Sequence, residues 1–286
     1  MAASTAALRG ITKQYKDFTL GPVDMTVPAG SIVGLIGENG AGKTTLLKIL
    51  CGVNRADDGT VDLRGGSPAD AATRAKIGVV FEDAFFYGSF TAAQVARSLA
   101  GMYGARWNAD SFSVYLRRFG LDAGKKLKEY SRGMRLKLSL AAALSHDPEL
   151  LVLDEATAGL DPVVRGELLD LFLEFIQDER HSIVMSSHIT ADLEQIADSI
   201  AYLHNGQLLF QENKDDLLQE YGVLHCGEDV LTSLPAGLVV FTRRGAYGCE
   251  SLVRERRTVQ ELLPEAVCDA ARLDDIMRFY SGRDAQ

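Results

Sequence analysis

Short, continuous apolar runs recur along the first three-quarters of the chain, separated by longer amphipathic stretches. Four of these runs predict buried strands, at 32–36, 77–81, 150–153 and 182–186. Stretches with helical spacing lie between them, and Asp161-Pro162 is the strongest helix start, a capping residue followed by proline in the first turn. Because strands alternate with helices, the pattern predicts the α/β fold class with a mixed, largely parallel core sheet.

Two regions depart from this alternation. The residues before the first apolar run predict strands and turns, which we interpret as an N-terminal antiparallel β subdomain. The stretch from about 84 to 146 predicts a helical insertion, with Thr91 capping one helix and either Asn108 or Asp110 capping the next. Farther along, Asn205-Gly206 lies between two apolar segments and is the best hairpin signal in the chain.

The character of the sequence changes again near residue 222. The segments become shorter, as at 237–242, and a final helix is predicted near 274–280. We therefore expect one large domain over residues 1–222 and a small α+β accessory domain over 223–286.

Composition and charge narrow the classes of function. The hydrophobic fraction of 47% and charged fraction of 24% are typical of a globular protein. The net charge of −9 argues against broad nucleic-acid binding, so no nucleic-acid partner is expected. The four cysteines are scattered without metal-ligand spacing, which disfavours structural zinc. An arginine-rich stretch at 243–257 favours a solvated face, with anionic lipid or a protein partner as alternatives.

The glycine-rich segment 37–44, Gly-Glu-Asn-Gly-Ala-Gly-Lys-Thr, joins an apolar strand to a predicted helix. This is the spacing and context of a phosphate-binding loop, whose backbone N–H groups curl around a β-phosphate. Lys43 would neutralise phosphate charge, and the hydroxyl of Thr44 would reach Mg²⁺. ATP and Mg²⁺ are the expected cofactors. The candidate ATP-binding residues of this segment are Gly37, Asn39, Gly40, Gly42, Lys43, Thr44 and Thr45.

A second segment supplies carboxylates to the same site. The apolar strand 150–153 is followed by Asp154 and Glu155. Asp154 is placed to hold Mg²⁺, directly or through water, and Glu155 to act as general base toward an attacking water. Alone, this pair would often be a charge pair at a helix start, but together with the glycine-rich loop it predicts a hydrolytic nucleotide site.

With these two motifs in place, residues 5 to 222 resemble the ATPase subunit of an ABC transporter. Tyr130-Ser131-Arg132-Gly133-Met134 stands where that family has its signature sequence, although only the serine and the second glycine of the usual Leu-Ser-Gly-Gly-Gln are kept. The resemblance implies that Ser131 and Gly133 contact the γ-phosphate bound by another protomer. A helix cap is the alternative role of the same serine.

The resemblance assigns three further positions. Ala158-Gly159-Leu160-Asp161 is similar to the D-loop at the dimer interface, and Asp161 is also a suitable helix cap. His188 follows a strand and matches the switch histidine that senses the γ-phosphate. Tyr15 stands where the family places an aromatic ring on adenine, with Phe18 nearby as an alternative.

One position departs from the family pattern. After the strand 77–81 the family normally has glutamine, whereas this chain has Glu82 followed by Asp83. We expect Glu82 to be a metal ligand together with Thr44 and Asp154, although it brings extra negative charge to a triphosphate site. The alternative is a solvated acidic turn.

The resemblance implies a translocation-coupled ATP hydrolase that works as a head-to-tail dimer, either a homodimer or a pair with a related subunit. An integral membrane transporter subunit is the implied partner, at the cytoplasmic face of the cell membrane, where this chain would be peripheral. Glu82 and the altered signature are similar to the bacterial ABC-2 type branch that exports peptides, bacteriocins or drugs. Alternatives are an importer ATPase, a soluble ABC ATPase acting on ribosomes or DNA, and a scaffold that binds ATP without hydrolysis.

Overall fold

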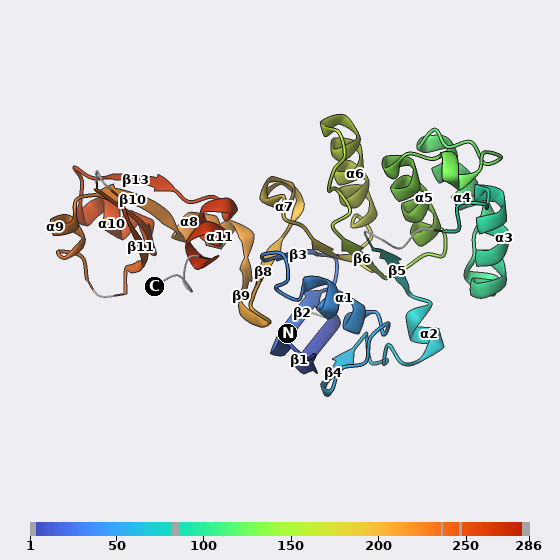
Figure 1. Cartoon of the computed structure of the whole chain (residues 1–286), viewed down its shortest axis with the longest axis horizontal. Coiled ribbons are helices and arrows are strands. Elements are labelled where there is room, and N and C mark those ends of the chain that lie inside the picture. Colours follow the sequence, from blue (N-terminus) through green and yellow to red (C-terminus); the bar gives the residue numbers. More distant parts are fainter. Residues whose placement is uncertain (1–3, 82–85, 236, 246–247, 282–286) are drawn as a thin grey trace.

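The central element is a six-stranded sheet in the order β5-β6-β7-β3-β8-β9 (Figure 1). A computed structural model describes residues 4–81, 86–235, 237–245 and 248–281. Neighbouring strands are parallel except for the antiparallel β8–β9 hairpin, so the expected mixed α/β sheet is confirmed. The strands are β3 (Ile32–Ile36), β5 (Ile77–Val80), β6 (Leu150–Asp154), β7 (Ser182–Ser186), β8 (Ser199–His204) and β9 (Gln207–Asn213).

The hairpin between β8 and β9 turns at Asn205-Gly206, as the sequence predicts. Both residues have positive φ, 46° and 80°, which is the conformation of a two-residue turn that suits the right-handed twist of the strands. The backbone N–H of Gly206 donates to the carbonyl of Ala41, 3.1 Å away. The hairpin turn therefore lies against the glycine-rich loop.

An antiparallel sheet of β1 (Ser4–Gln14), β2 (Thr19–Pro28) and β4 (Asp58–Asp62) lies beside the core sheet. Its apolar side chains, those of helix α1 (Lys43–Leu50) and those of one face of the core sheet form a single buried cluster. Helix α1 therefore packs in one apolar cluster with both sheets. This packing fixes the position of the glycine-rich loop that precedes the helix.

The helical insertion forms its own apolar cluster at one end of the molecule (Figure 1). It contains α3 (Ala92–Tyr103), α4 (Ala109–Arg118) and α5 (Arg132–Leu144). Thr91 and Gln94 form a capping box at the start of α3. Asn108, and not Asp110, caps α4 by accepting from the backbone N–H of Ser111.

The remaining helices of the first 222 residues lie around the core sheet. They are α2 (Ala71–Arg74), α6 (Pro162–Phe175), α7 (Thr190–Ile196) and α8 (Lys214–Glu220). Asp161 caps α6 with proline in the first turn, as expected. Within the part of the chain that the structure describes, no helix combines the length and apolar character needed to cross a membrane.

The C-terminal residues form a four-stranded antiparallel sheet in the order β11-β12-β10-β13 (Figure 1). The strands are β10 (Gly222–Cys226), β11 (Val239–Gly245), β12 (Gly248–Val253) and β13 (Val267–Ala270), and the helices are α9 (Glu228–Leu231), α10 (Arg256–Leu262) and α11 (Leu273–Ser281).

The last helix returns to the core sheet. Leu273, Ile276 and Phe279 of α11 belong to the same buried cluster as Tyr202 of β8. The ring of Tyr280 lies edge-on to Tyr202, with ring centroids 5.6 Å apart. The C-terminal sheet is therefore joined to the core sheet by the chain at its entry and by apolar packing at its exit.

The packing of α6 yields a test of this core. Phe172 is fully buried on α6, whereas Val163 on the same helix is 72% exposed. Phe172→Ala is expected to lower the free energy of unfolding by about 3–5 kcal/mol, because it removes a large apolar side chain and leaves a cavity. Val163→Ala should change it by less than about 0.5 kcal/mol. Chemical denaturation monitored by circular dichroism measures both, and equal losses would contradict this packing.

Candidate nucleotide site

The glycine-rich loop follows β3 and curls back on itself. The Lys43 ammonium donates to the carbonyls of Gly37 and Glu38, at 2.7 and 3.2 Å. A Cβ at Gly37 would collide with the carbonyl of Leu203, and a Cβ at Gly42 would lie 2.8 Å from the ring of Phe18. Both glycines also have positive φ, so the close approach of neighbouring backbone and ring requires glycine here.

A cavity of about 270 Å³ lies on this loop. Lys43 is only 6% exposed, and α1 begins at Lys43, so the helix N-terminus faces the loop. Exposed N–H groups at a helix start and a lysine ammonium favour a phosphate ligand. The cavity is lined by Phe18, Glu38, Asn39, Gly40, Gly42, Lys43, Thr44, Thr45 and Glu155.

The Asp154 side chain is held by one donor from helix α1 and one from strand β7. The hydroxyl of Thr44 donates to its Oδ2 at 2.8 Å, and the hydroxyl of Ser186 donates to its Oδ1 at 2.6 Å. Asp154 and Ser186 face each other in the parallel register of β6 and β7, and the Asp154 side chain is almost fully buried. A buried carboxylate needs such donors, and here they also fix the direction of both oxygens.

Glu155 lies between Lys43 and His188. Its Oε2 is 2.5 Å from Nδ1 of His188 and accepts from the His188 backbone N–H at 3.2 Å. Its Oε1 is 3.7 Å from the Lys43 ammonium. The backbone of Glu155 has φ of 53°, a conformation that non-glycine residues rarely adopt, and Ser186 holds it there by accepting from its N–H. The strained backbone aims the carboxylate into the cavity.

Ser131, Gly133 and Asp161 do not line this cavity. The hydroxyl oxygen of Ser131 caps α5 by accepting from the Met134 N–H at 3.2 Å, and Asp161 caps α6 by accepting from Val164 at 3.0 Å. A Cβ at Gly133 would be 3.4 Å from the Leu160 side chain. The signature-like segment and the loop before α6 therefore lie next to each other, and neither lines the cavity on the glycine-rich loop of its own chain.

The two aromatic candidates occupy different places. Tyr15 is 43% exposed, does not line the cavity, and accepts a hydrogen bond from the Asn54 amide at 3.4 Å. Phe18 lines the cavity, and the two ring centroids are 6.4 Å apart. Glu82 lies outside the described residues.

Sequence reasoning missed Ser186. Its signal was available in principle, because a serine that ends one buried parallel strand stands beside a carboxylate that ends the neighbouring strand. Which strands are neighbours, however, depends on the strand order. The sequence pattern alone did not supply that order.

A glycine-rich loop that joins β3 to a helix, with the paired carboxylates Asp154 and Glu155 at the end of β6, defines a P-loop ATPase domain of the ABC type. The sequence profile of the family described as "ABC transporter" matches residues 20–158. The chain is 28% identical to a solved structure titled as the ATP binding subunit of an ABC transporter, with a TM-score of 0.66 over 75% of this chain and 92% of that one.

Relatives with assigned names agree. The chain is 35% identical over 212 residues to the bacitracin transport ATP-binding protein BcrA of Enterococcus faecalis, covering 72% of this chain and 68% of that protein. It is 33% identical over 211 residues to the lantibiotic transport ATP-binding protein SrtF of Streptococcus pyogenes, covering 73% and 90%. The chain is 37% identical over 206 residues to an uncharacterized ABC transporter ATP-binding protein of Synechocystis. The match covers 70% of this chain but only 58% of the length of that protein. The chain belongs to the ABC transporter ATP-binding protein family.

The contacts of Ser186 generate a prediction. Ser186→Ala leaves Oδ1 of the buried Asp154 without its hydroxyl donor, which should lower the free energy of unfolding by about 1–3 kcal/mol. Ser113→Ala, which removes an exposed hydroxyl bonded to its own helix, should change it by less than about 0.5 kcal/mol. Thermal unfolding measures both variants. A Ser186→Ala chain as stable as the Ser113→Ala control would refute the proposed support of Asp154.

Proposed function

We propose that this chain binds and hydrolyses ATP to power a membrane transporter, and that the transporter exports peptides, bacteriocins or drugs. The observation that carries the hydrolytic part is the placement of Glu155 between Lys43 and His188 at the mouth of the phosphate cavity. The export part rests on the transport roles in the names of the bacitracin and lantibiotic relatives.

The residues around Asp154 fit Mg²⁺. The Thr44 hydroxyl oxygen and Asp154 Oδ2 are 2.8 Å apart, and both are hard oxygen donors of the kind that Mg²⁺ accepts from protein, with phosphate oxygens and waters completing its shell. When bound, the ion would neutralise charge on the phosphates and polarise them. The hydroxyls of Thr44 and Ser186 donate to the two oxygens of Asp154 and so orient this carboxyl group for that role. We infer no role for Glu82 from the geometry.

Glu155 is the candidate general base. Its carboxylate is fixed by the His188 ring and backbone N–H, so it accepts the proton of an attacking water from one defined direction. Lys43 would bind the β- and γ-phosphates, and the N–H groups of the glycine-rich loop would surround them. His188 positions Glu155 and is exposed enough to contact a γ-phosphate as well, with its side chain 55% accessible.

A second protomer would complete the site. Ser131 and Gly133 stand at the N-terminus of α5, and the Ser131 oxygen that accepts from Met134 can still donate its own hydrogen to a phosphate. Because these residues do not line the cavity of their own chain, we propose that they close the cavity of another chain in a head-to-tail dimer. Asp161 and the loop before it would lie at that interface.

The proposed location is the cytoplasmic face of the cell membrane, where this chain would bind an integral membrane subunit peripherally. Residues 223–286 are the proposed accessory domain. The importer alternative uses the same site, whereas action on ribosomes or DNA is disfavoured by the net charge of −9.

Substitution of the general base tests hydrolysis. Glu155→Gln keeps the size and the contact with His188 but removes the proton acceptor, so turnover should fall by about 10²–10⁴-fold while ATP binding is retained. Steady-state phosphate release and equilibrium binding of a fluorescent ATP analogue measure the two quantities. Glu174→Gln is the matched control, because Glu174 is 62% exposed in an ion pair with Arg118, and its turnover should be unchanged.

Turnover of the Glu155→Gln chain near that of the control would show that another group accepts the proton. Loss of ATP binding together with turnover would instead assign Glu155 to nucleotide binding and not to the chemical step.

Capture of the membrane partner tests the transport role. The Glu155→Gln chain trapped with ATP is expected to co-purify, in mild detergent, with a polytopic membrane protein in near-equal amount, as measured by quantitative mass spectrometry. The Glu155→Gln chain carries an affinity tag for this purification, and the same chain without the tag serves as the control for nonspecific binding. Ribosomal proteins or DNA-processing factors in place of a membrane protein would contradict the transporter proposal and leave the ATPase proposal standing.

A further inference from the structure

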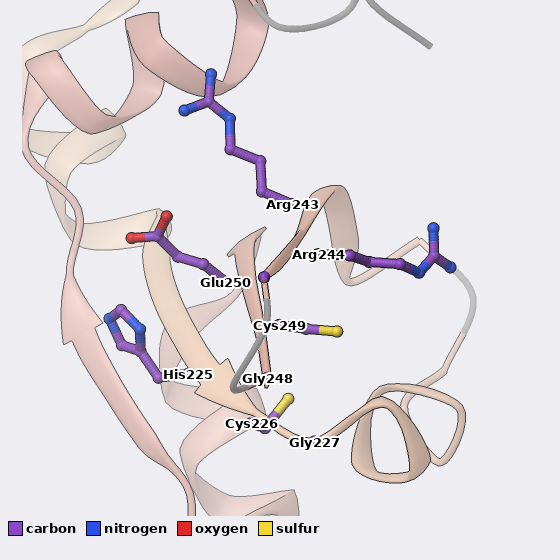
Figure 2. Close-up of a pocket in the computed structure, with 9 residues that line it drawn as sticks. His225, Cys226, Gly227, Arg243, Arg244, Gly248, Cys249 and Glu250 are labelled. Carbon is purple, nitrogen blue, oxygen red and sulfur yellow. The ribbon is translucent and has the colours of Figure 1, made fainter.

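The C-terminal sheet carries three cysteines on one face, and two of them are cross-strand neighbours. Cys226 at the end of β10 stands directly opposite Cys249 of β12 in the antiparallel register. Cys268 of β13 stands opposite Leu224 and not opposite either of the other cysteines. In Figure 2 the side chains of Cys226 and Cys249 leave adjacent strands on the same side of the sheet.

This register satisfies the distance requirement of a disulfide. Directly opposed residues of antiparallel strands have Cα atoms about 4.5 or 5.5 Å apart, and disulfides join Cα atoms about 4.4–6.8 Å apart. Cys268 is a diagonal neighbour of Cys226, and diagonal pairs are about 7–8 Å apart. The fold thus selects Cys226 and Cys249 from the three cysteines of this sheet.

The pair is reachable from one side. Cys226 is half-buried, whereas Cys249 is 7% exposed. Both line an open pocket of about 630 Å³ with His225, Arg243, Arg244 and Glu250 (Figure 2). Because Cys226 is the more exposed of the two, a small molecule in this pocket should reach it more readily than Cys249.

The two thiols also interact electrostatically. Burial raises the pKa of the Cys226 thiol, and the neighbouring Cys249 raises this pKa further. Cys226 is therefore mainly protonated at neutral pH, so exchange with a disulfide should be slow there. The effect of Cys249 on the pKa of Cys226 agrees with side chains that lie close together.

We propose that Cys226 and Cys249 form a dithiol site that exchanges with small disulfides of the glutathione type. The Cys226 thiolate attacks one sulfur of the small disulfide, the S–S bond breaks, and one small thiolate leaves and takes up a proton. The deprotonated Cys249 then attacks the Cys226 sulfur and releases the second small thiol. The net reaction oxidises two protein thiols to a disulfide between β10 and β12 and reduces one small disulfide to two thiols. It is independent of the proposed ATPase function.

Mapping of thiols after oxidation tests the proposal. The folded chain is incubated with oxidised glutathione at mildly alkaline pH, unfolded with an alkylating reagent present, digested, and analysed by mass spectrometry. The expected product joins Cys226 to Cys249, with Cys51 and Cys268 alkylated, and dithiothreitol should reverse it. Cys268→Ser is the matched control from the same face of the sheet and should give the same product.

The intermediate gives a second readout. In Cys249→Ser the second attack is impossible, so Cys226 should retain glutathione as a stable mixed disulfide. Cys249→Ala provides the same test if the serine variant does not fold, as judged by circular dichroism.

Three results would overturn the proposal. In the wild type, these are a persistent glutathione adduct on Cys226, complete alkylation of both cysteines, or a mixture of cysteine pairs matching that of the chain oxidised while unfolded in guanidinium. The last result would show that the strand register does not select the pair.

Discussion

Parallel strand pairing is the constraint on which the candidate nucleotide site depends. In a parallel sheet neighbouring strands end at the same edge, so the residues that follow β3, β6 and β7 are brought together although they are far apart in the sequence. This edge joins the Thr44 hydroxyl, the Asp154 carboxylate and the Ser186 hydroxyl in one chain of hydrogen bonds. The same Ser186 oxygen fixes the strained backbone of Glu155. The start of α1 and the end of β7 thus position the two carboxylates at the end of β6.

Two residues of the proposed dimer interface, Ser131 and Asp161, also stabilise the fold as helix caps. Ser131 and Asp161 cap α5 and α6, and each cap satisfies a backbone N–H that the helix itself leaves free. Each cap thereby fixes the start of its helix by a side-chain hydrogen bond. A cap of this kind prepares a surface for an anion from another molecule without using up the serine's own hydrogen.

The elements that could be predicted from the sequence are mostly those set by residues close together in the chain. The apolar runs, the Asn205-Gly206 turn, the Asp161-Pro162 start and the glycine-rich loop each depend on neighbours in the chain, so their structure followed from the sequence. Contacts between residues far apart in the chain could not be predicted from the sequence pattern. The order of the strands places Ser186 beside Asp154. The close packing of Phe18 against Gly42 places that ring in the cavity in place of Tyr15. The packing of α11 against Tyr202 joins residues that lie far apart in the sequence. The sequence left Asn108 and Asp110 as equal candidates for the cap of α4, and only the backbone geometry there identifies Asn108 as the capping residue.

The return of α11 has a mechanical consequence. A domain attached only by its entry strand could swing independently, but this sheet leaves the core after α8 and is fastened to it again by the aromatic contacts of Tyr280 with Tyr202 and Phe210. Tyr202 lies on β8, which is hydrogen-bonded to β3 immediately before the glycine-rich loop. The C-terminal sheet is therefore attached a second time to the core, at a strand that pairs with β3 next to the nucleotide site.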